Sequence, residues 1–448
     1  MSAAGHGMGV LIHNKVPPWP IDRRRRRHGS TDIAGSYGGR VLKSRLLQWV
    51  TSASRVFVWA LLRIIPPRPH AVVFGWPDNE GNTVEIVRSL VRRYHGRVYW
   101  LLDDPAYRGP MFAAKELAAS ERLVSVSKGS IRAFALSIAA ELTFFTHGLY
   151  TAVNPPRNRL VVNVWHGDGP KRLYQTNLVR STVLVSGSLM WSKYKAEVFG
   201  TPPGSLALVG NPRSDQFWEH LPETAVCRLG LTEGRPRVLW LPTYREAQGP
   251  RSRRWSDGEQ LSESEPVDRL THAMVHAAEL HGLDLVVKPH PLDLDTYRNT
   301  GVRVLRNEDL DAAGVSLYQL IGHSDALVSD ISSVWVDYLM LDRPIGFLMP
   351  DLEELKERRG LNVENLEDLL PGMRIDSAEG AAAFLAGVAA RSVDLRPSAF
   401  DSVAEIGVPG GPGITERLID WLGDYQRAKG RRRLFDGRDA ASSVNAHS

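Results

Sequence analysis

Three short segments of this chain combine residue types that suit reactions at phosphate groups. Each follows an apolar run typical of a buried strand, and each supplies an imidazole, a cation or hydroxyl groups. Imidazole is the commonest proton acceptor near neutral pH, and ammonium and guanidinium groups neutralise phosphate charge. The combination predicts phosphoryl-transfer chemistry. The segments are Val164-Trp165-His166-Gly167-Asp168-Gly169-Pro170-Lys171-Arg172, Lys288-Pro289-His290-Pro291 and Ser329-Asp330-Ile331-Ser332-Ser333.

The first two segments each place a histidine where a strand is expected to end. His166 could take a proton from an acceptor hydroxyl, and the glycines after it permit a close approach of the backbone. Asp168 would either orient that ring or cap the turn. In the second segment the prolines stiffen the chain and hold Lys288 and His290 at the end of a strand. Histidines in loops are mostly structural, but the placement of His290 at the end of a strand favours a functional role.

The third segment stands between an apolar run over 326–328 and a helix expected to begin at Val334. A Ser or Asp at such a junction caps the helix. The free N–H groups and the positive dipole end of a helix also bind phosphate. A plain helix cap explains the same residues without any ligand. The local sequence does not decide between the two interpretations.

Other well-known phosphate and metal motifs are missing from the sequence. It has no GxxxxGK[ST] loop and no GxGxxG after a strand. Cys227 is the one cysteine, which excludes a disulfide framework and indicates a reducing compartment. No Cys/His cluster suits zinc, and no dedicated metal cage is visible. Mg²⁺ stays open as a cofactor, because substrate phosphates and water often hold it.

Apolar runs alternate with helical patterns from residue 71 onward, which predicts parallel sheets covered on both faces. The chain has 448 residues and 43% hydrophobic content, enough for two or three domains with real cores. We expect an α/β fold of two doubly wound, Rossmann-like domains facing each other across a cleft. The N-terminal domain is assigned to 67–225 and the C-terminal domain to 226–425, with a long loop over 245–266. In such folds ligands bind outside the carboxyl ends of the strands.

The amino-terminal part of the chain is strongly basic. The net charge is +5, and residues 21–70 hold eleven Arg and Lys against two acids. Residues 1–40 and 426–448 are predicted to be disordered. Residues 41–66 favour an amphipathic helix on an anionic membrane surface over a bilayer span, because Arg55 and Arg63 interrupt it. A helix packed on the protein's own domain is the alternative. No nucleic-acid partner is expected, since no recognition motif accompanies the arginines.

Together, the motifs resemble those of the CDP-glycerol glycerophosphotransferase family, the teichoic acid primases and polymerases. Any one motif is weak, but their order and rough spacing are kept over about residues 70–425. They are Trp165-His166-Gly167, Gly210-Asn211-Pro212-Arg213-Ser214-Asp215, Leu241-Pro242-Thr243-Tyr244-Arg245, Lys288-Pro289-His290-Pro291, Ser329-Asp330-Ile331-Ser332-Ser333 and Arg343-Pro344, together with Arg359-Gly360 and Pro371-Gly372.

The resemblance implies a glycosyltransferase-B-like fold with a membrane-associated amino-terminal part. Such an enzyme moves glycerol phosphate from CDP-glycerol to a hydroxyl of a lipid-linked acceptor, at the cytoplasmic face of the plasma membrane, and releases CMP. By this analogy His166 is the base on the acceptor side, and His290 acts on the donor side. Positioning and charge neutralisation dominate phosphoryl transfer. The substrate-binding residues it implies are Gly167, Lys171, Arg213, Thr243, Arg245, Lys288, Ser329, Asp330, Ser332 and Ser333.

The chain also departs from the family pattern. Asp168 stands where the family has Thr, Ile331 replaces the usual Tyr, and His147 stands where relatives often have Asp. The transferred unit is therefore open, and CDP-ribitol or another CDP-linked polyol is an alternative donor. Two further alternatives are a nucleotide-sugar glycosyltransferase of the same fold and a membrane-attached envelope scaffold with a decayed site.

Overall fold

The computed structural model describes residues 54–106, 117, 120–148, 153–173, 179–243, 267–290, 294, 297, 300–395 and 405–436. Several predictions concern residues outside these ranges. They are the disordered segment 1–40, the first part of the helix over 41–66, Arg245 and the loop over 245–266. Of the helix expected over 41–66, the structure shows the part over 54–64.

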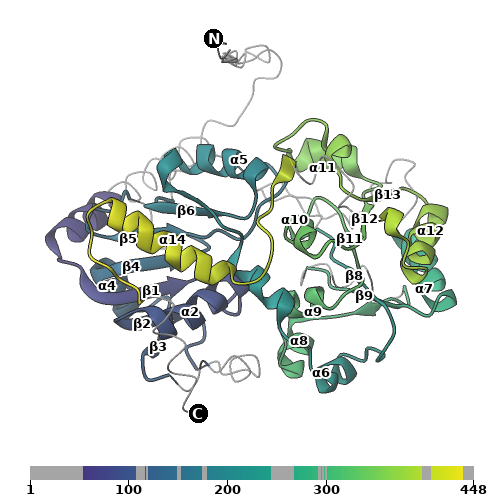
Figure 1. Ribbon diagram of the computed structural model, residues 1–448, viewed down its shortest axis with the longest axis horizontal. Coiled ribbons are helices and arrows are strands. Elements are labelled where there is room, and N and C mark those ends of the chain that lie inside the picture. The colour runs from purple at the N-terminus through teal and green to yellow at the C-terminus, as the bar shows by residue number, and fades with distance from the viewer. Residues whose placement is uncertain are drawn as a thin grey trace, which may run out of the picture. The chain divides into compact units, whose positions relative to one another are not determined.

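The first sheet consists of seven short strands that all run parallel (Figure 1). Their order is β3-β2-β1-β4-β5-β6-β7, so the chain builds outward from β1 in both directions. Val72, Val98 and Val162 are fully buried, as expected where helices cover both faces. The strands are β1 (Arg68–Phe74), β2 (Arg97–Leu102), β3 (Leu123–Ser127), β4 (Ala140–Phe145), β5 (Leu160–Asn163), β6 (Val183–Ser186) and β7 (Leu206–Leu208).

Helices α2 (Gly81–Arg93), α4 (Ile131–Ala139) and α5 (Leu189–Phe199) accompany this sheet. The sequence of α2 explains its limits. The Glu80 side chain accepts a hydrogen bond from the Thr83 N–H at its start, and two arginines occupy its last turn, where the helix dipole favours cations. Its apolar residues Val84, Val87 and Leu90 recur at helical spacing and are buried in the core of the sheet.

The second sheet has six parallel strands in the order β10-β9-β8-β11-β12-β13. They are β8 (Arg237–Trp240), β9 (Asp284–Val287), β10 (Arg303–Val304), β11 (Ala326–Ser329), β12 (Ile345–Leu348) and β13 (Met373–Ile375). The accompanying helices are α6 (Glu223–Arg228), α7 (Val267–Leu280), α8 (Asn307–Ala313), α9 (Leu317–Gly322), α10 (Val334–Tyr338), α11 (Leu352–Arg359) and α12 (Ala378–Ala389).

Both sheets therefore follow the same doubly wound order, and the predicted fold class is confirmed. The order reverses between β1 and β4 in the first sheet, and between β8 and β11 in the second. At such a reversal, the connections that follow the two adjacent strands run to opposite faces of the sheet. A crevice therefore opens between them at the carboxyl ends of the strands. The two reversals mark where ligand sites are expected.

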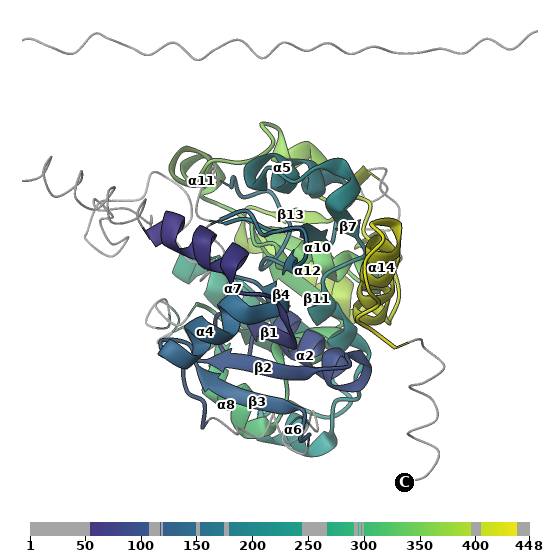
Figure 2. The same ribbon diagram turned by 90° about the vertical axis from the view of Figure 1, so that its left-hand side faces the viewer.

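The C-terminal part of the chain departs from the prediction. Helix α14 (Ile414–Ala428) lies within the range assigned to the C-terminal domain, yet Leu418 and Leu422 are buried in the core of the seven-stranded sheet. Figures 1 and 2 show this helix, in yellow, beside the first sheet. Residues 426–436 are not disordered: Leu434 and Phe435 are buried, and Phe435 pairs with Tyr94. The chain returns to the first sheet because packing there removes the apolar face of α14 and these two side chains from water.

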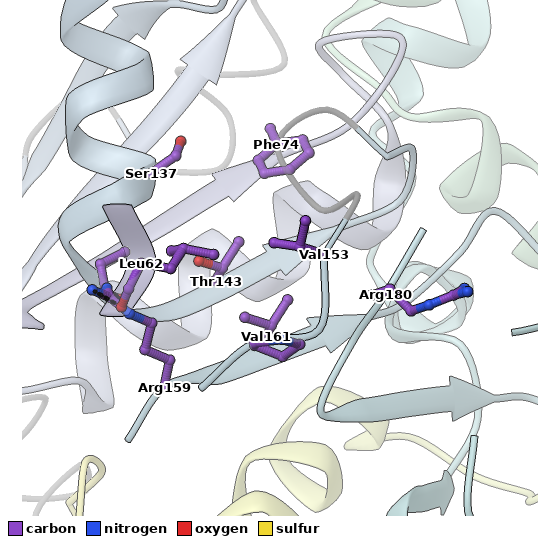
Figure 3. Close-up of a pocket in the computed structure, with 10 residues that line it drawn as sticks. Leu62, Phe74, Ser137, Thr143, Val153, Arg159, Val161 and Arg180 are labelled. Atoms are coloured by element: carbon purple, nitrogen blue, oxygen red, sulfur yellow. Dashed lines mark hydrogen bonds between the residues drawn. The ribbon is translucent and has the colours of Figure 1, made fainter. Parts of the chain in front are cut away.

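The helix over 54–64 rests on the first sheet at one side only. Leu62 is buried, and Figure 3 shows it near Arg159. Arg159 Nη2 donates to the carbonyls of Leu62 and Ile65 in this region, and its Nη1 donates to the Ala140 carbonyl at the start of β4. The opposite side is apolar and exposed, through Val56, Phe57, Trp59 and Ile64. Within the described part of the chain, no helix combines the length and apolarity that a membrane span requires.

Candidate active site

A cavity of about 580 Å³ lies between residues of the two sheets' domains. Its volume falls within the usual range for small-molecule sites. The first domain contributes the segment after β5 and two residues of α5, and the second contributes the start of α10 and the chain after α11. The lining residues are Trp165, His166, Gly167, Asp168, Gly169, Lys171, Arg172, Leu173, Trp191, Lys195, Ile331, Ser333 and Asn362.

His166 stands three residues after β5, in a sharp turn. Trp165 has a φ of 58° and Gly167 a φ of 145°, so the backbone on both sides of the histidine is left-handed. Such a conformation is costly for tryptophan and persists where surrounding contacts enforce it. Here Asn82 Nδ2 donates to the Trp165 carbonyl at 3.3 Å, and Arg213 Nη1 donates to the His166 carbonyl at 2.8 Å. These two contacts fix the histidine at the cavity wall.

The His166 ring is part of an aromatic stack at the reversal of the first sheet. Its centroid lies 4.7 Å from that of His147, with the planes 9° apart, and 4.3 Å from Trp165. His147 follows β4 by two residues, so the crevice between β1 and β4 supplies one face of the stack. Thr146 Oγ1 lies 3.0 Å from His147 Nδ1. In the sequence, His147 is marked only by its departure from the family pattern.

The electrostatics keep both imidazoles neutral. The His166 ring is accessible from the cavity, but protein crowds it on its other sides, and this desolvation together with His147 and nearby cations lowers its pKa to about 3. Burial and Lys128 also lower the pKa of His147. A neutral imidazole has a free lone pair and can accept a proton. The cavity therefore presents a potential base at neutral pH.

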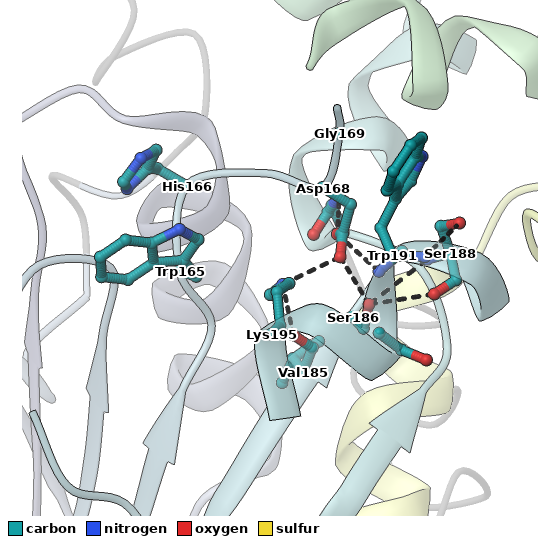
Figure 4. A network of polar contacts seen from close by, with 12 residues as sticks. Trp165, His166, Asp168, Gly169, Val185, Ser186, Ser188, Trp191 and Lys195 are labelled. Carbon is teal, nitrogen blue, oxygen red and sulfur yellow. Dashed lines mark hydrogen bonds and ion pairs between the residues drawn. The ribbon is translucent and has the colours of Figure 1, made fainter. Parts of the chain in front are cut away.

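Asp168 does not orient the His166 ring. Its carboxylate is buried and accepts hydrogen bonds from Ser186 Oγ at 2.5 Å and the Gly187 N–H at 2.8 Å (Figure 4). Lys195 Nζ lies 3.1 Å from its Oδ1 and also donates to the Val185 carbonyl. Asp168 thus ties the loop to β6 and α5. It holds the turn, which is one of the two roles that the sequence left open.

Arg213 lies in a second buried network, which crosses between the domains. Its Nε and Nη2 donate to Asp337 Oδ2 at 3.0 and 2.7 Å, and its guanidinium lies 4.7 Å from the Tyr318 ring centroid. Burial acts to lower the pKa of Arg213, but Tyr318 and Asp337 outweigh it and raise that pKa. Asn211 Nδ2 joins the networks by donating to both Asp337 and Asp168. Arg213 therefore holds the His166 loop from beneath, and its predicted contact with substrate stays a prediction.

The two glycines of the His166 loop allow it to touch the start of α10. A Cβ on Gly167 would lie 2.6 Å from Ser333 Oγ and 2.9 Å from Arg213 Nη2. A Cβ on Gly169 would lie 3.1 Å from Ser333 Cα. Ser333 itself makes no side-chain cap of α10, contrary to the helix-cap interpretation. Helix α10 is also only five residues long, which weakens the dipole argument for phosphate binding.

The loop is closed on its far side by Asn362. Asn362 Nδ2 donates to the carbonyls of Gly169 and Lys171 at 3.1 and 3.0 Å, and its N–H donates to the Pro170 carbonyl. The Arg172 N–H donates to the Gly360 carbonyl. The family motif includes Arg359-Gly360 but gives no signal for Asn362, which stands two residues further on. Lys195 was also missed, because nothing in the sequence of α5 marks it.

The remaining predicted residues gather at the carboxyl edge of the second sheet. Thr243 donates from N and Oγ1 to Asp330 at 2.7 and 2.5 Å, across the reversal between β8 and β11. Asp330 Oδ1 also accepts from the Ser332 N–H, and Ser329 Oγ donates to the Leu241 carbonyl. Asp330 and Ser329 are buried and serve to shape this edge.

Lys288 and His290 follow β9, the strand beside β8. Burial lowers the pKa of Lys288, with Glu308 acting in the opposite direction. Neither residue lines the cavity around His166. The structure thus brings His166, Gly167, Lys171 and Ser333 together, whereas Thr243, Lys288 and His290 share the neighbouring sheet edge. Among the described residues, no group of three or more His, Cys, Asp or Glu is placed to hold a metal ion.

Fold and site define a glycosyltransferase-B-like α/β protein with a histidine and cations in the cavity between its domains. A family model described as CDP-glycerol:poly(glycerophosphate) glycerophosphotransferase matches residues 63–395, well over half of the chain. The chain therefore belongs to this family, as its motifs predicted.

Curated relatives agree with this placement. The chain is 23% identical over 242 residues to a teichoic acid glycerol-phosphate primase of Bacillus subtilis, covering 50% of this chain and 58% of the relative. It is 31% identical over 173 residues to a teichoic acid ribitol-phosphate primase of Bacillus spizizenii, covering 36% and 40%. The chain thus spans about half the length of these relatives.

Solved structures show the same fold. The wall teichoic acid polymerase TagF superposes with a TM-score of 0.58 at 17% identity, over 88% of this chain and 100% of that one. A UDP-N-acetylglucosamine 2-epimerase from Listeria monocytogenes, putative by its description, gives a TM-score of 0.50 at 12% identity, over 83% and 99%.

Proposed function

We propose that the protein transfers glycerol phosphate from CDP-glycerol to a hydroxyl of a lipid-linked glycerol-phosphate acceptor, in the synthesis of a teichoic acid or related envelope polymer. The observation that carries the proposal is a neutral His166 on the wall of a cavity that also holds Lys171, Arg172 and Ser333. Family membership supports the same reaction class.

In the proposed reaction His166 takes the proton of the acceptor hydroxyl. The acceptor oxygen then bonds to the phosphorus that carries the glycerol, and the bond from that phosphorus to the oxygen of CMP breaks. The proton stays on the imidazole and CMP leaves as an anion. A pKa of about 3 makes His166 a weak base in the free protein. A bound pyrophosphate offsets the cations around the ring, which raises that pKa and improves the base.

The donor is assigned to the carboxyl edge of the second sheet. Thr243, Lys288 and His290 share this edge, and its β8–β11 reversal is the type of position where nucleotides bind in doubly wound sheets. Lys288 and His290 would neutralise the charge that develops on the departing CMP. Arg245, implied by the motif resemblance, belongs to the same proposal.

Attachment to the membrane is part of the proposal. The exposed apolar side of the helix over 54–64 includes Phe57 and Trp59, and eleven basic residues occur over 21–70. Apolar side chains with neighbouring cations favour the surface of an anionic bilayer. A peripheral site on the cytoplasmic face would bring the cavity to a lipid-linked acceptor.

The first test is CMP release by purified protein on anionic vesicles with a lipid-linked glycerol-phosphate acceptor. CDP-glycerol and CDP-ribitol are offered separately, because the ribitol-phosphate primase relative makes ribitol phosphate a specific second candidate. His166→Ala and His290→Ala should abolish release, whereas His281→Ala, an exposed histidine after α7, should not. Folded protein that releases CMP from neither donor would overturn the proposal.

A further inference from the structure

A second cavity, of about 240 Å³, opens at the amino edge of the seven-stranded sheet. It lies where β4 and β5 begin and where the chain leaves α14. Three arginines and one glutamate line it, so its side chains carry a net charge of +2 (three minus one). This arginine cavity is formed by Glu141, Asn158, Arg159, Leu160, Gln426, Arg431, Arg432 and Leu434.

Polar atoms in the arginine cavity are buried without partners. Arg159 Nε, Arg431 Nη1 and Gln426 Oε1 have no hydrogen-bond partner among the described residues. Arg159 and Gln426 are only 2% and 3% exposed. Buried polar atoms are nearly always paired in folded proteins, so three on the residues around one cavity show that its walls are short of hydrogen-bond acceptors and donors. The Gln426 amide can offer either its oxygen or its NH₂ group to a polar ligand.

Glu141 does not neutralise these arginines. Its Oε1 accepts a hydrogen bond from the Tyr94 hydroxyl at 2.7 Å, which turns the carboxylate toward α2. No ion pair between Glu141 and Arg159, Arg431 or Arg432 is found in the described part of the chain. The terminal nitrogens of Arg159 instead donate to backbone carbonyls. Carbonyls carry only partial charges, so the positive charge of the cavity persists.

The arginine cavity is distant from the proposed active site. Arg159 precedes β5 and His166 follows it, seven residues further along. Strand β5 has four residues and spans about 13 Å at roughly 3.3 Å per residue, so the two lie at opposite ends of this strand. Arg159 also closes the end of the helix over 54–64, whose other side exposes Phe57 and Trp59. The cavity is therefore beside the segment proposed to meet the membrane.

We propose that the arginine cavity binds a phosphate group, as a monoester or diester, separately from the donor and acceptor at the His166 cavity. Guanidinium groups match phosphate oxygens with paired, charge-assisted hydrogen bonds. The bound group neutralises the net positive charge of the cavity and accepts hydrogen bonds from the guanidinium groups that line it. Two sources present this chemistry: the headgroup of an anionic lipid, and a soluble glycerol phosphate unit.

The test measures binding, not turnover, by the full chain. Glycerol phosphate is titrated calorimetrically, and vesicles of phosphatidylglycerol or phosphatidylcholine are tested by co-sedimentation. Arg431→Ala with Arg432→Ala should weaken binding of the true probe about tenfold or more, since two charge-assisted contacts are lost. Arg427→Ala with Lys429→Ala removes the same charge from exposed positions outside the cavity and should change binding by less than about twofold.

Glu141→Gln provides a second variant with the opposite expected sign. It removes the one carboxylate of the cavity and keeps an acceptor for Tyr94, so phosphate should bind more tightly. If the variant with Arg431→Ala and Arg432→Ala loses binding only to phosphatidylglycerol vesicles, the ligand is a lipid headgroup. If it loses binding only to glycerol phosphate, the ligand is a soluble ester. The inference would be overturned if the cavity variant (Arg431→Ala with Arg432→Ala) and the control variant (Arg427→Ala with Lys429→Ala) lost binding equally, or if neither lost any. CDP-glycerol binding should be unaffected, which separates this outcome from a failure of the proposed transferase function.

Discussion

Arg213 and Asp337 form a buried ion pair that joins the two domains directly beneath the His166 loop. Nε and Nη2 of the arginine donate to one carboxylate oxygen, at 3.0 and 2.7 Å, while Nη1 donates to the His166 carbonyl at 2.8 Å. Arg213 comes from the 3₁₀ helix η3 (Pro212–Trp218) and Asp337 from α10. One guanidinium thus connects the position of the histidine to the arrangement of the domains.

Asp337→Asn should strongly destabilise the protein. It leaves the Arg213 charge buried without its partner, and removing one member of such a pair typically costs about 3–5 kcal/mol. Urea unfolding measures the loss of free energy of unfolding. Arg92→Ala breaks an exposed ion pair with Glu416 and should cost no more than about 1 kcal/mol. Similar losses in both variants would contradict a special role for the buried pair.

Gly167→Ala should impair the His166 cavity. The new Cβ would lie 2.6 Å from Ser333 Oγ, and its φ of 145° is one that residues with side chains rarely adopt. We expect at least about a tenfold loss of CMP release and about 1–3 kcal/mol of destabilisation. Gly204→Ala is the matched control, since nothing lies within 4 Å of a Cβ there. Wild-type activity in Gly167→Ala would show that the close approach is dispensable.

The histidine should stay neutral well below its ordinary titration range. Desolvation lowers the pKa of His166 to about 3 from 6.5, so the unfolded chain binds more protons than the folded one between these values. The contribution of His166 to stability is therefore complete above pH 6.5 and decreases as the pH falls toward 3. NMR titration of labelled histidines, assigned with His166→Gln, measures the ring directly. Protonation of His166 near pH 6.5 in the free protein would contradict the environment described.

Binding of CDP-glycerol should raise the same pKa. The nucleotide brings negative charge close to the cations that help to lower it, so the ring should gain proton affinity. Repeating the NMR titration with saturating nucleotide tests this, and glycerol alone serves as an uncharged control. A ring that titrates identically with and without nucleotide would place the pyrophosphate away from His166.

Asp168→Thr, which introduces the residue typical of the family, should destabilise this chain. The substitution removes the Asp168 carboxylate that lies 3.1 Å from Lys195 Nζ. Burial already lowers the pKa of Lys195, so its charge would then be buried without a partner carboxylate. A loss of about 3–5 kcal/mol is expected. Combining it with Lys195→Met, which replaces the ammonium by an apolar group of similar length, should restore much of that stability. Additive losses in chemical unfolding would show that the two residues are not coupled.

The strands and the region of the site were predictable because their signals are local. Buried parallel strands are continuous apolar runs, such as Ala71 to Phe74, and they appear without knowledge of the partner strands. His166 and Ser333 could be placed near a ligand because both follow such runs, and carboxyl ends of parallel strands share one edge. The sequence could not predict which sheet α14 packs against, because an amphipathic pattern shows which face of a helix is buried but not what covers that face.

The sequence by itself determined the fold class, the family and the segments that carry the histidines. Only the tertiary structure decided what each polar residue does. Asp168 and Arg213 carry charges that suit a ligand, but residues far apart in the chain, Lys195 and Asp337, neutralise them in the interior. A charged group is satisfied by whatever the fold brings within hydrogen-bond distance. That distance depends on how strands and helices pack, which no local motif encodes.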